Sequence, residues 1–252
     1  MTSIPRYIER RIRRAIPHNS FIVPGSTPVV AFGNSRSARV ATLGLNPSRA
    51  EFLDRDGNEL KGDDRRLATH SSIGSSNLAD APDTAVAQVL KDCDFYFQRN
   101  PYRKWFDQLE PALNACDPSY YNGSACHLDL VQWATNPTWA KLELSAVRNR
   151  LLNEDSAFLA EQLSSENISL VIVNGMGVIR QMEKKLSLSL NELEPIKGLS
   201  YRATRLFSGT INSKVNVLAW STNLQSSYGV TSELRAEISR RIGDQAKRII
   251  SH

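Results

Sequence analysis

The chain has 252 residues, 41% of them hydrophobic, which is enough to bury the core of one large α/β domain. Its 31 Lys and Arg residues against 26 Asp and Glu give a formal net charge of +5, which suits a polyanionic partner. No apolar run is long enough for a membrane helix and the start lacks the layout of a signal peptide, so we expect a cytoplasmic protein. Three widely spaced cysteines indicate neither a disulfide framework nor a zinc site.

The first predicted element is a basic amphipathic helix over about residues 5–16. Ile8, Ile12 and Ile16 recur four apart on one face, and arginines surround them. Such a helix could lie along DNA phosphates. Docking against the rest of the domain, with the arginines in solvent, is an equally good interpretation.

A hairpin and a long insertion are predicted next. Apolar runs at 28–32 and 38–43 flank the turn-forming residues 33–37, a pattern typical of a hairpin. Residues 49–94 are polar and form a long insertion. Within it, Asp-Ala-Pro supplies a cap and a first-turn proline for a helix over about 80–93.

Helices and strands alternate over the rest of the chain. This alternation predicts right-handed crossovers and a mostly parallel central sheet in a three-layer α/β/α domain that spans residues 1–252. In such sheets, ligands bind at the carboxyl ends of the strands. Helices are expected over about 105–115, 141–166, 178–186 and 231–250, and strands over about 125–131, 168–173, 201–207 and 215–220.

The sequence contains no nucleotide-binding glycine motif and no nucleophile elbow, and its four histidines have no metal-ligand spacing. We therefore expect neither a cofactor nor a metal. Polar turns directly after predicted strands remain as candidates, at 44–48, 127–133 and 221–227. By itself, the first of them is also typical of an ordinary Asx or proline turn.

In this order and separation, these turns resemble the uracil-DNA glycosylase superfamily, most closely its mismatch-specific and thymine-DNA glycosylase branch. Gly44-Leu45-Asn46-Pro47-Ser48 is similar to the water-activating Gly-Ile-Asn-Pro-Gly motif of that branch, which implies that Asn46 is the catalytic asparagine. Residues 97–106 resemble the segment whose phenylalanine stacks on the flipped base, which implies this role for Phe97 or, failing that, for Tyr96. Core packing is the alternative for this aromatic cluster. The resemblance covers roughly residues 38–240.

Two further segments complete the resemblance. Leu128-Asp129-Leu130-Val131-Gln132 is similar to a pocket strand that reads the base edge, and residues 223–230 are similar to a loop that supports the pocket and sends a wedge into the duplex. Base contacts are implied for Leu128, Asp129 and Asn223. DNA contacts are expected from Ser48, Arg99, Arg103, Lys104, Leu224, Gln225, Ser226 and Tyr228.

The chain departs from the family in ways that affect the substrate. Family members that read uracil have an asparagine in the pocket strand, where this chain has His127, Leu128 and Asp129. Asp129 could accept a hydrogen bond from a cytosine-type amino group, and a capping or solvent-facing aspartate is the alternative. The second loop has Leu224-Gln225 in place of Pro-Ser. The insertion over 49–94 is longer than in the family and could enclose a bulkier base.

The resemblance implies a monofunctional DNA glycosylase that flips a nucleotide out of double-stranded DNA and hydrolyses its N-glycosidic bond without a cofactor. The carbonyl of Asn46 would hold the attacking water. The departures favour a bulky target, a glucosylated hydroxymethylcytosine in phage DNA, removed as a defence activity. Repair of uracil or mismatched thymine is the first alternative. The second is a catalytically silent nucleic-acid-binding module of the same fold.

Overall fold

The computed structural model describes residues 4–225 and 229–250. The chain groups into two compact units, each assembled from three stretches of sequence. The expectation of one domain over 1–252 stays a prediction. The first unit contains Met1–Asn34, Leu45–Pro101 and Leu128–Ser165, and the second contains Ser35–Gly44, Tyr102–His127 and Glu166–His252.

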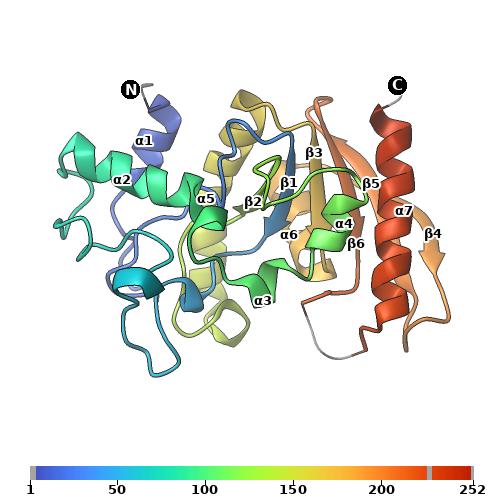
Figure 1. The fold of residues 1–252 in the computed structure, drawn as a ribbon, viewed down its shortest axis with the longest axis horizontal. Helices are drawn as coiled ribbons and strands as arrows, with labels where there is room; N and C mark the ends of the chain where they lie inside the picture. Colours follow the sequence, from blue (N-terminus) through green and yellow to red (C-terminus); the bar gives the residue numbers. More distant parts are fainter. Residues whose placement is uncertain (1–3, 226–228, 251–252) are drawn as a thin grey trace. The chain divides into compact units, whose positions relative to one another are not determined.

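Six strands form one sheet, which makes the chain an α/β protein (Figure 1). The strands are β1 (Val40–Gly44), β2 (Ala125–Asp129), β3 (Leu170–Asn174), β4 (Asn191–Ile196), β5 (Thr204–Ile211) and β6 (Val215–Trp220). Their order across the sheet is β2-β1-β3-β6-β5-β4. The β1–β3 and β3–β6 pairs are parallel, whereas β5 and β4 add an antiparallel edge.

The parallel strands follow from their residues. β3 reads Leu-Val-Ile-Val-Asn and is buried throughout, as a strand covered on both faces requires. Its residue Val171 lies opposite Ala41 of β1 and Val217 of β6. The strand predicted over 215–220 is confirmed. β4 was not predicted, because its sequence Asn-Glu-Leu-Glu-Pro-Ile is polar and largely exposed at the edge of the sheet.

The predicted hairpin over 28–43 is wrong. Residues 38–43 do enter β1, but residues 28–32 belong to no named strand although they are buried. Instead, Val29 N donates to the carbonyl oxygen of Gln132 at 2.8 Å. The two runs even belong to different units, since β1 takes its partners from strands much later in the chain.

The helices agree with the predicted pattern in order but not always in length. α1 ends at Ile12, four residues before the predicted end. The helix predicted over 105–115 is two helices, because Pro111 lies in the first turn of α4 and favours a new helix start there. No helix in the described ranges is long and apolar enough to cross a membrane. The helices are α1 (Arg6–Ile12), α2 (Asp83–Asp94), α3 (Arg103–Phe106), α4 (Glu110–Asn114), α5 (Ser145–Ser165), α6 (Met176–Leu186) and α7 (Ser232–Ile250).

In the first unit, α1 packs against α5 and α2. Ile8 and Ile12 are fully buried, so the amphipathic face is a docking face. Its arginines are held by carboxylates of the same unit, which supports the docked interpretation of this helix. The ion pairs join Arg10 to Glu161, Arg11 to Asp155, Arg13 to Glu9 and Asp83, and Arg14 to Glu154 and Asp155.

In the second unit, α7 packs against β6 and α4 (Figure 1). Gly243 of α7 faces the end of α4 so closely that a Cβ at this position would stand 2.5 Å from the carbonyl oxygen of Ala115. Only a glycine allows this approach.

Candidate active site

Asn46 follows the end of β1 by two residues, and its side chain is anchored at one end. Nδ2 donates to the carbonyl oxygen of Trp133 at 3.1 Å and to Oγ1 of Thr135 at 3.4 Å. Because a carbonyl only accepts, Nδ2 must face Trp133 and the amide orientation is determined. No described residue donates to Oδ1. The half-buried Asn46 therefore presents a fixed carbonyl acceptor.

The turn that carries Asn46 is held on both sides. Val131 N donates to the carbonyl oxygen of Leu45 at 2.9 Å, which joins the segment after β2 to the turn after β1. On the other side, Ser48 Oγ accepts from Ala50 N at 3.2 Å and caps the short 3-10 helix η1 (Arg49–Glu51). Ser48, expected to contact DNA, thus has a local structural role as well.

A buried ion pair fixes the segment that anchors Asn46. The guanidinium of Arg11 donates to Asp155 Oδ2 and to Gln132 Oε1, both at 3.0 Å. Asp155 Oδ2 also accepts from Gln132 N at 3.0 Å, and the Arg11 guanidinium lies 5.0 Å from the centre of the Trp133 ring. Burial lowers the pKa of Arg11, and the Asp155 carboxylate opposes that shift. α1 and α5 therefore position the segment from Gln132 to Trp133.

Two buried acids lie near this turn. Glu51, at the end of η1, is 2% exposed, and Asp129, at the end of β2, is 5% exposed. Their charges interact, since the Asp129 carboxylate contributes to the raised pKa of Glu51. Tyr96 Oη donates to Glu51 Oε2 at 2.7 Å. Sequence reasoning singled out Asp129, and Tyr96 only as the alternative to Phe97 for stacking on the base, but not Glu51.

The pKa of Glu51 is raised from 4.5 to about 7. The largest cause is burial, which removes water from the charged form, and the Asp129 charge adds to it. The hydrogen bond from Tyr96 and the positive charge of Arg66 act in the opposite direction. Near neutral pH, Glu51 therefore exists as a mixture of acid and carboxylate, which suits a group that moves a proton.

The local sequence pattern around Glu51 is misleading. Ser48-Arg49-Ala50-Glu51 matches the Ser-x-x-Glu pattern of a helix capping box, which would place the glutamate at an exposed helix start. The structure instead turns Glu51 toward Tyr96, more than 40 residues further along the chain. A contact of this separation has no local sequence pattern.

Phe97 and Leu128 are buried in the first unit, at 5% and 1% exposure. The Phe97 ring packs edge-on against Tyr96, with 5.1 Å between ring centres, so Phe97 belongs to the same cluster as Glu51. Arg99 pairs with the buried Asp92 of α2 at 2.5 Å. Its guanidinium is therefore held by the insertion, whether or not it also meets DNA.

The loop after β6 forms a separate cluster in the second unit. The side-chain amide of Asn174, at the end of β3, uses all of its hydrogen-bonding positions. Nδ2 donates to Asn223 Oδ1 at 3.0 Å and to Gln225 Oε1 at 2.9 Å, while Oδ1 accepts from Trp220 Nε1 at 2.8 Å and from Leu224 N at 2.9 Å. The structure thus brings Asn223, Leu224 and Gln225 together. The expected contacts by Ser226 and Tyr228 lie outside the described residues.

The two basic residues of this unit that are expected to contact DNA, Arg103 and Lys104, are exposed on α3. Arg103 pairs with Asp107 at 3.4 Å and lies 4.4 Å from the centre of the Tyr121 ring. Lys104 is exposed. Gln225 Nε2 donates to the carbonyl oxygen of Trp105 at 3.4 Å, so the loop after β6 lies beside α3. These residues form one surface of the second unit.

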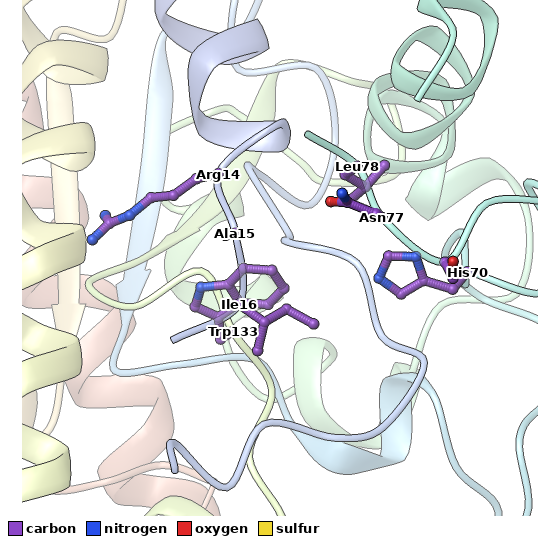
Figure 2. Close-up of a pocket in the computed structure, with 8 residues that line it drawn as sticks. Arg14, Ala15, Ile16, His70, Asn77, Leu78 and Trp133 are labelled. Atoms are coloured by element: carbon purple, nitrogen blue, oxygen red, sulfur yellow. The ribbon is translucent and has the colours of Figure 1, made fainter. Parts of the chain in front are cut away.

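A cavity of about 150 Å³ lies in the first unit, as Figure 2 shows. Trp133 and Ile16 lie on one side of it, and His70 and Leu78 on the other. Four of its lining residues come from the insertion: His70, Ser76, Asn77 and Leu78. The insertion thus lines a partly open pocket that borders Trp133, whose carbonyl oxygen anchors Asn46.

Within residues 4–225 and 229–250, no three His, Cys, Asp or Glu side chains gather closely enough to hold a metal ion. Comparison with models of known protein families finds no match to this chain. Comparison with curated proteins likewise finds no significant similarity. The site therefore has to be interpreted from its own geometry and from the sequence resemblance.

Proposed function

We propose that the chain is a DNA glycosylase in which Asn46 holds the water that attacks the N-glycosidic bond. The observation that carries the proposal is the anchored amide, because Nδ2 is fixed by Trp133 and Thr135 while Oδ1 has no donor among the described residues. A neutral, immobile carbonyl can orient a water molecule without adding charge beside a phosphate backbone. The nucleotide would be flipped out of the duplex to reach it.

The target base that suits this site best is a modified cytosine. Asp129 supplies acceptor oxygens, and cytosine presents an exocyclic amino donor where uracil presents a carbonyl. The cavity bordered by the insertion favours a bulky substituent, such as the glucose of a glucosylated hydroxymethylcytosine in phage DNA. Excision of uracil or mismatched thymine in repair is the second candidate. A silent DNA-binding module is the third.

The remaining parts of the proposal come from the resemblance. They are the three-layer glycosylase-like arrangement, action in the cytoplasm, stacking of Phe97 on the base, and DNA contacts by α3 and the loop after β6. The exposed Lys104 and Arg103 support the last of these, because cations beside a duplex bind phosphates without regard to sequence.

The first prediction tests Asn46 directly. Purified protein is incubated with duplexes carrying uracil, mismatched thymine, hydroxymethylcytosine or its glucosylated form, and abasic sites are measured in single turnover. We expect release of the modified cytosine. The Asn46→Ala variant should excise about 100- to 1,000-fold more slowly, because it loses the group that orients water in the transition state.

Asn191→Ala is the matched control, since Asn191 is an exposed amide at the start of β4. It should excise like the unchanged protein. Efficient release of plain uracil without action on modified cytosines would restore the repair role. Near-normal excision by Asn46→Ala would show that Asn46 does not hold the water, and the absence of abasic sites on every substrate would favour the silent module.

A further inference from the structure

We propose that Glu51 is a second catalytic residue, which in its protonated form donates its proton to ring nitrogen N3 of a flipped cytosine-class base as the N-glycosidic bond breaks. The inference rests on the proposed function and adds to it the fate of the leaving base. Asn46 would orient the attacking water, and Glu51 would protonate the leaving base.

The position of Glu51 supports this role. Glu51 follows Asn46 by five residues in the segment after β1. The hydrogen bond from Val131 N to the carbonyl oxygen of Leu45 joins this segment to the one that follows Asp129. Asn46 and the two acids thus belong to one continuous cluster of the first unit. The cluster is buried, but its chemistry is polar, which is unusual for a part of the chain with only a packing role.

One oxygen of Glu51 is available for a substrate. Oε2 accepts from Tyr96 Oη at 2.7 Å, whereas Oε1 has no hydrogen-bond partner among the described residues. A protonated carboxyl held at one oxygen by Tyr96 can direct its O–H from the other oxygen toward a ligand.

Burial favours the acid form of Glu51 at neutral pH, and the polar and charged groups around it modify that effect. Asp129, at the end of β2, repels a second negative charge, and the 3-10 segment that follows α2 supplies Tyr96. The positive charge of Arg66, in the insertion, lowers the pKa of Glu51 and so favours its carboxylate form. Burial outweighs these partners and raises the pKa of Glu51 to about 7. A general acid is most effective when its pKa lies near the working pH.

A carboxyl pair of this kind matches cytosine and opposes uracil. Cytosine carries an acceptor at N3 beside an amino donor, so Glu51 O–H can donate to N3 while Asp129, whose two carboxylate oxygens are enclosed in the free protein, accepts from the amino group of the entering base. Uracil carries N3–H beside a carbonyl oxygen. With uracil, the donor of Glu51 would face a donor and the carboxylate of Asp129 would face an acceptor.

The step balances with water alone. The bond between C1′ and N1 breaks, its electron pair goes to the base, and the water oxygen bonds to C1′. The proton of Glu51 moves to N3, so the base leaves neutral rather than as an anion. The water loses a proton, and Glu51 regains one from solvent. The net change is addition of one water across the glycosidic bond.

The test is the pH dependence of single-turnover excision on the cytosine-class duplex. For the unchanged protein, the rate should fall as the pH rises through about 7, where Glu51 loses its proton. Glu51→Gln keeps the size of the side chain and can still donate a hydrogen bond to N3, but it cannot transfer a proton. We expect it to bind the duplex normally and to excise about 100- to 10,000-fold more slowly, without the fall near neutral pH.

Two further variants sharpen the test. Tyr96→Phe removes the hydrogen bond that stabilises the Glu51 carboxylate, so the fall in rate should move to higher pH. Asp63→Asn, an exposed acid in the same insertion, should change neither the rate nor the profile. Protonation of Glu51 is also measured without DNA, as the infrared carboxyl signal that disappears in Glu51→Gln.

The outcomes separate the two proposals. If the unchanged protein excises the base and Glu51→Gln keeps its rate and pH profile, Glu51 is not the acid although the glycosylase remains. If the unchanged protein excises nothing, the proposed function fails first. An infrared titration with Glu51 already ionised at pH 5 contradicts the role of Glu51 in either case.

Discussion

Glu51 destabilises the folded chain whenever it is ionised. In the unfolded chain its pKa is close to the ordinary 4.5, and in the folded chain it is about 7. A glutamate with a raised folded-state pKa contributes stability that is fully present below the unfolded value and is lost as the pH rises through the folded value. The difference between the two pKa values corresponds to a loss of about 3 kcal/mol in the free energy of unfolding, since each pKa unit is worth about 1.36 kcal/mol.

This cost predicts an unusual stability profile for Glu51→Gln. The amide has no charge to bury and can still accept from Tyr96. At pH 8.5 the free energy of unfolding of the variant should therefore be about 3 kcal/mol higher than that of the unchanged protein. At pH 4 the difference should be close to zero. Urea unfolding at the two pH values measures it. Equal stability at pH 8.5 would mean that the carboxylate is well solvated or well paired.

The residues of the site differ in how far the sequence reveals them. Asn46 lies two residues after β1 and Asp129 is the last residue of β2, both in recognisable segments, and both belong to the first unit. The roles found for Glu51, Tyr96 and Arg11 have no such signal, because these roles depend on contacts 45 to 144 residues away in sequence. Sequence patterns report periodicity and turns, and neither specifies which distant side chains meet.

Gly243 gives a prediction for a single element. Replacing a glycine inside a helix with alanine ordinarily stabilises the helix by about 1 kcal/mol. Gly243→Ala should do the opposite, because its Cβ would stand 2.5 Å from a backbone oxygen and α7 would have to move away from α4. We expect a loss on the order of 2 kcal/mol, within the range for overpacked sites.

Gly177→Ala is the matched control in α6. This glycine has an ordinary backbone conformation, and a Cβ there would meet no atom within 4 Å. The free energy of unfolding of Gly177→Ala should therefore be up to about 1 kcal/mol higher than that of the unchanged protein. Thermal unfolding of both variants measures these two changes in stability. A stabilised Gly243→Ala would mean that α7 and the end of α4 are further apart than described.

Elements with strong local patterns were predicted well. The buried run of β3, the strand β6 and the long helix α7 were each found within three residues at both ends. The errors arose where neighbours in space decide the outcome. Residues 28–32 have the composition of a strand but belong to none of the named strands, and β4 has a polar sequence but pairs with β5.

The positive charge of the whole molecule is less available to DNA than its net value of +5 suggests. Arg10 on α1, and Arg13 and Arg14 just after it, already pair with carboxylates, whereas Lys104 on α3 is exposed. DNA affinity should therefore depend on salt mainly through residues such as Lys104. Lys104→Gln should lower the slope of log K against log salt by about 0.9, the value for one phosphate contact.

Arg10→Gln should leave that slope unchanged, because Arg10 is held by Glu161. Fluorescence anisotropy with a labelled duplex at several salt concentrations measures both variants. If Arg10→Gln lowered the slope and Lys104→Gln did not, the DNA would lie along α1 instead of α3.

The interleaving of the two units has a consequence for synthesis of the chain on the ribosome. The first unit has all of its stretches once residue 165 has been made, whereas the second must wait for Glu166–His252. Until then β1 lacks β3, the parallel neighbour that begins 130 residues after it. An unpaired apolar strand edge is a template for association between chains. Nascent chains of this protein should therefore need chaperone protection longest at β1, well after the first unit can fold.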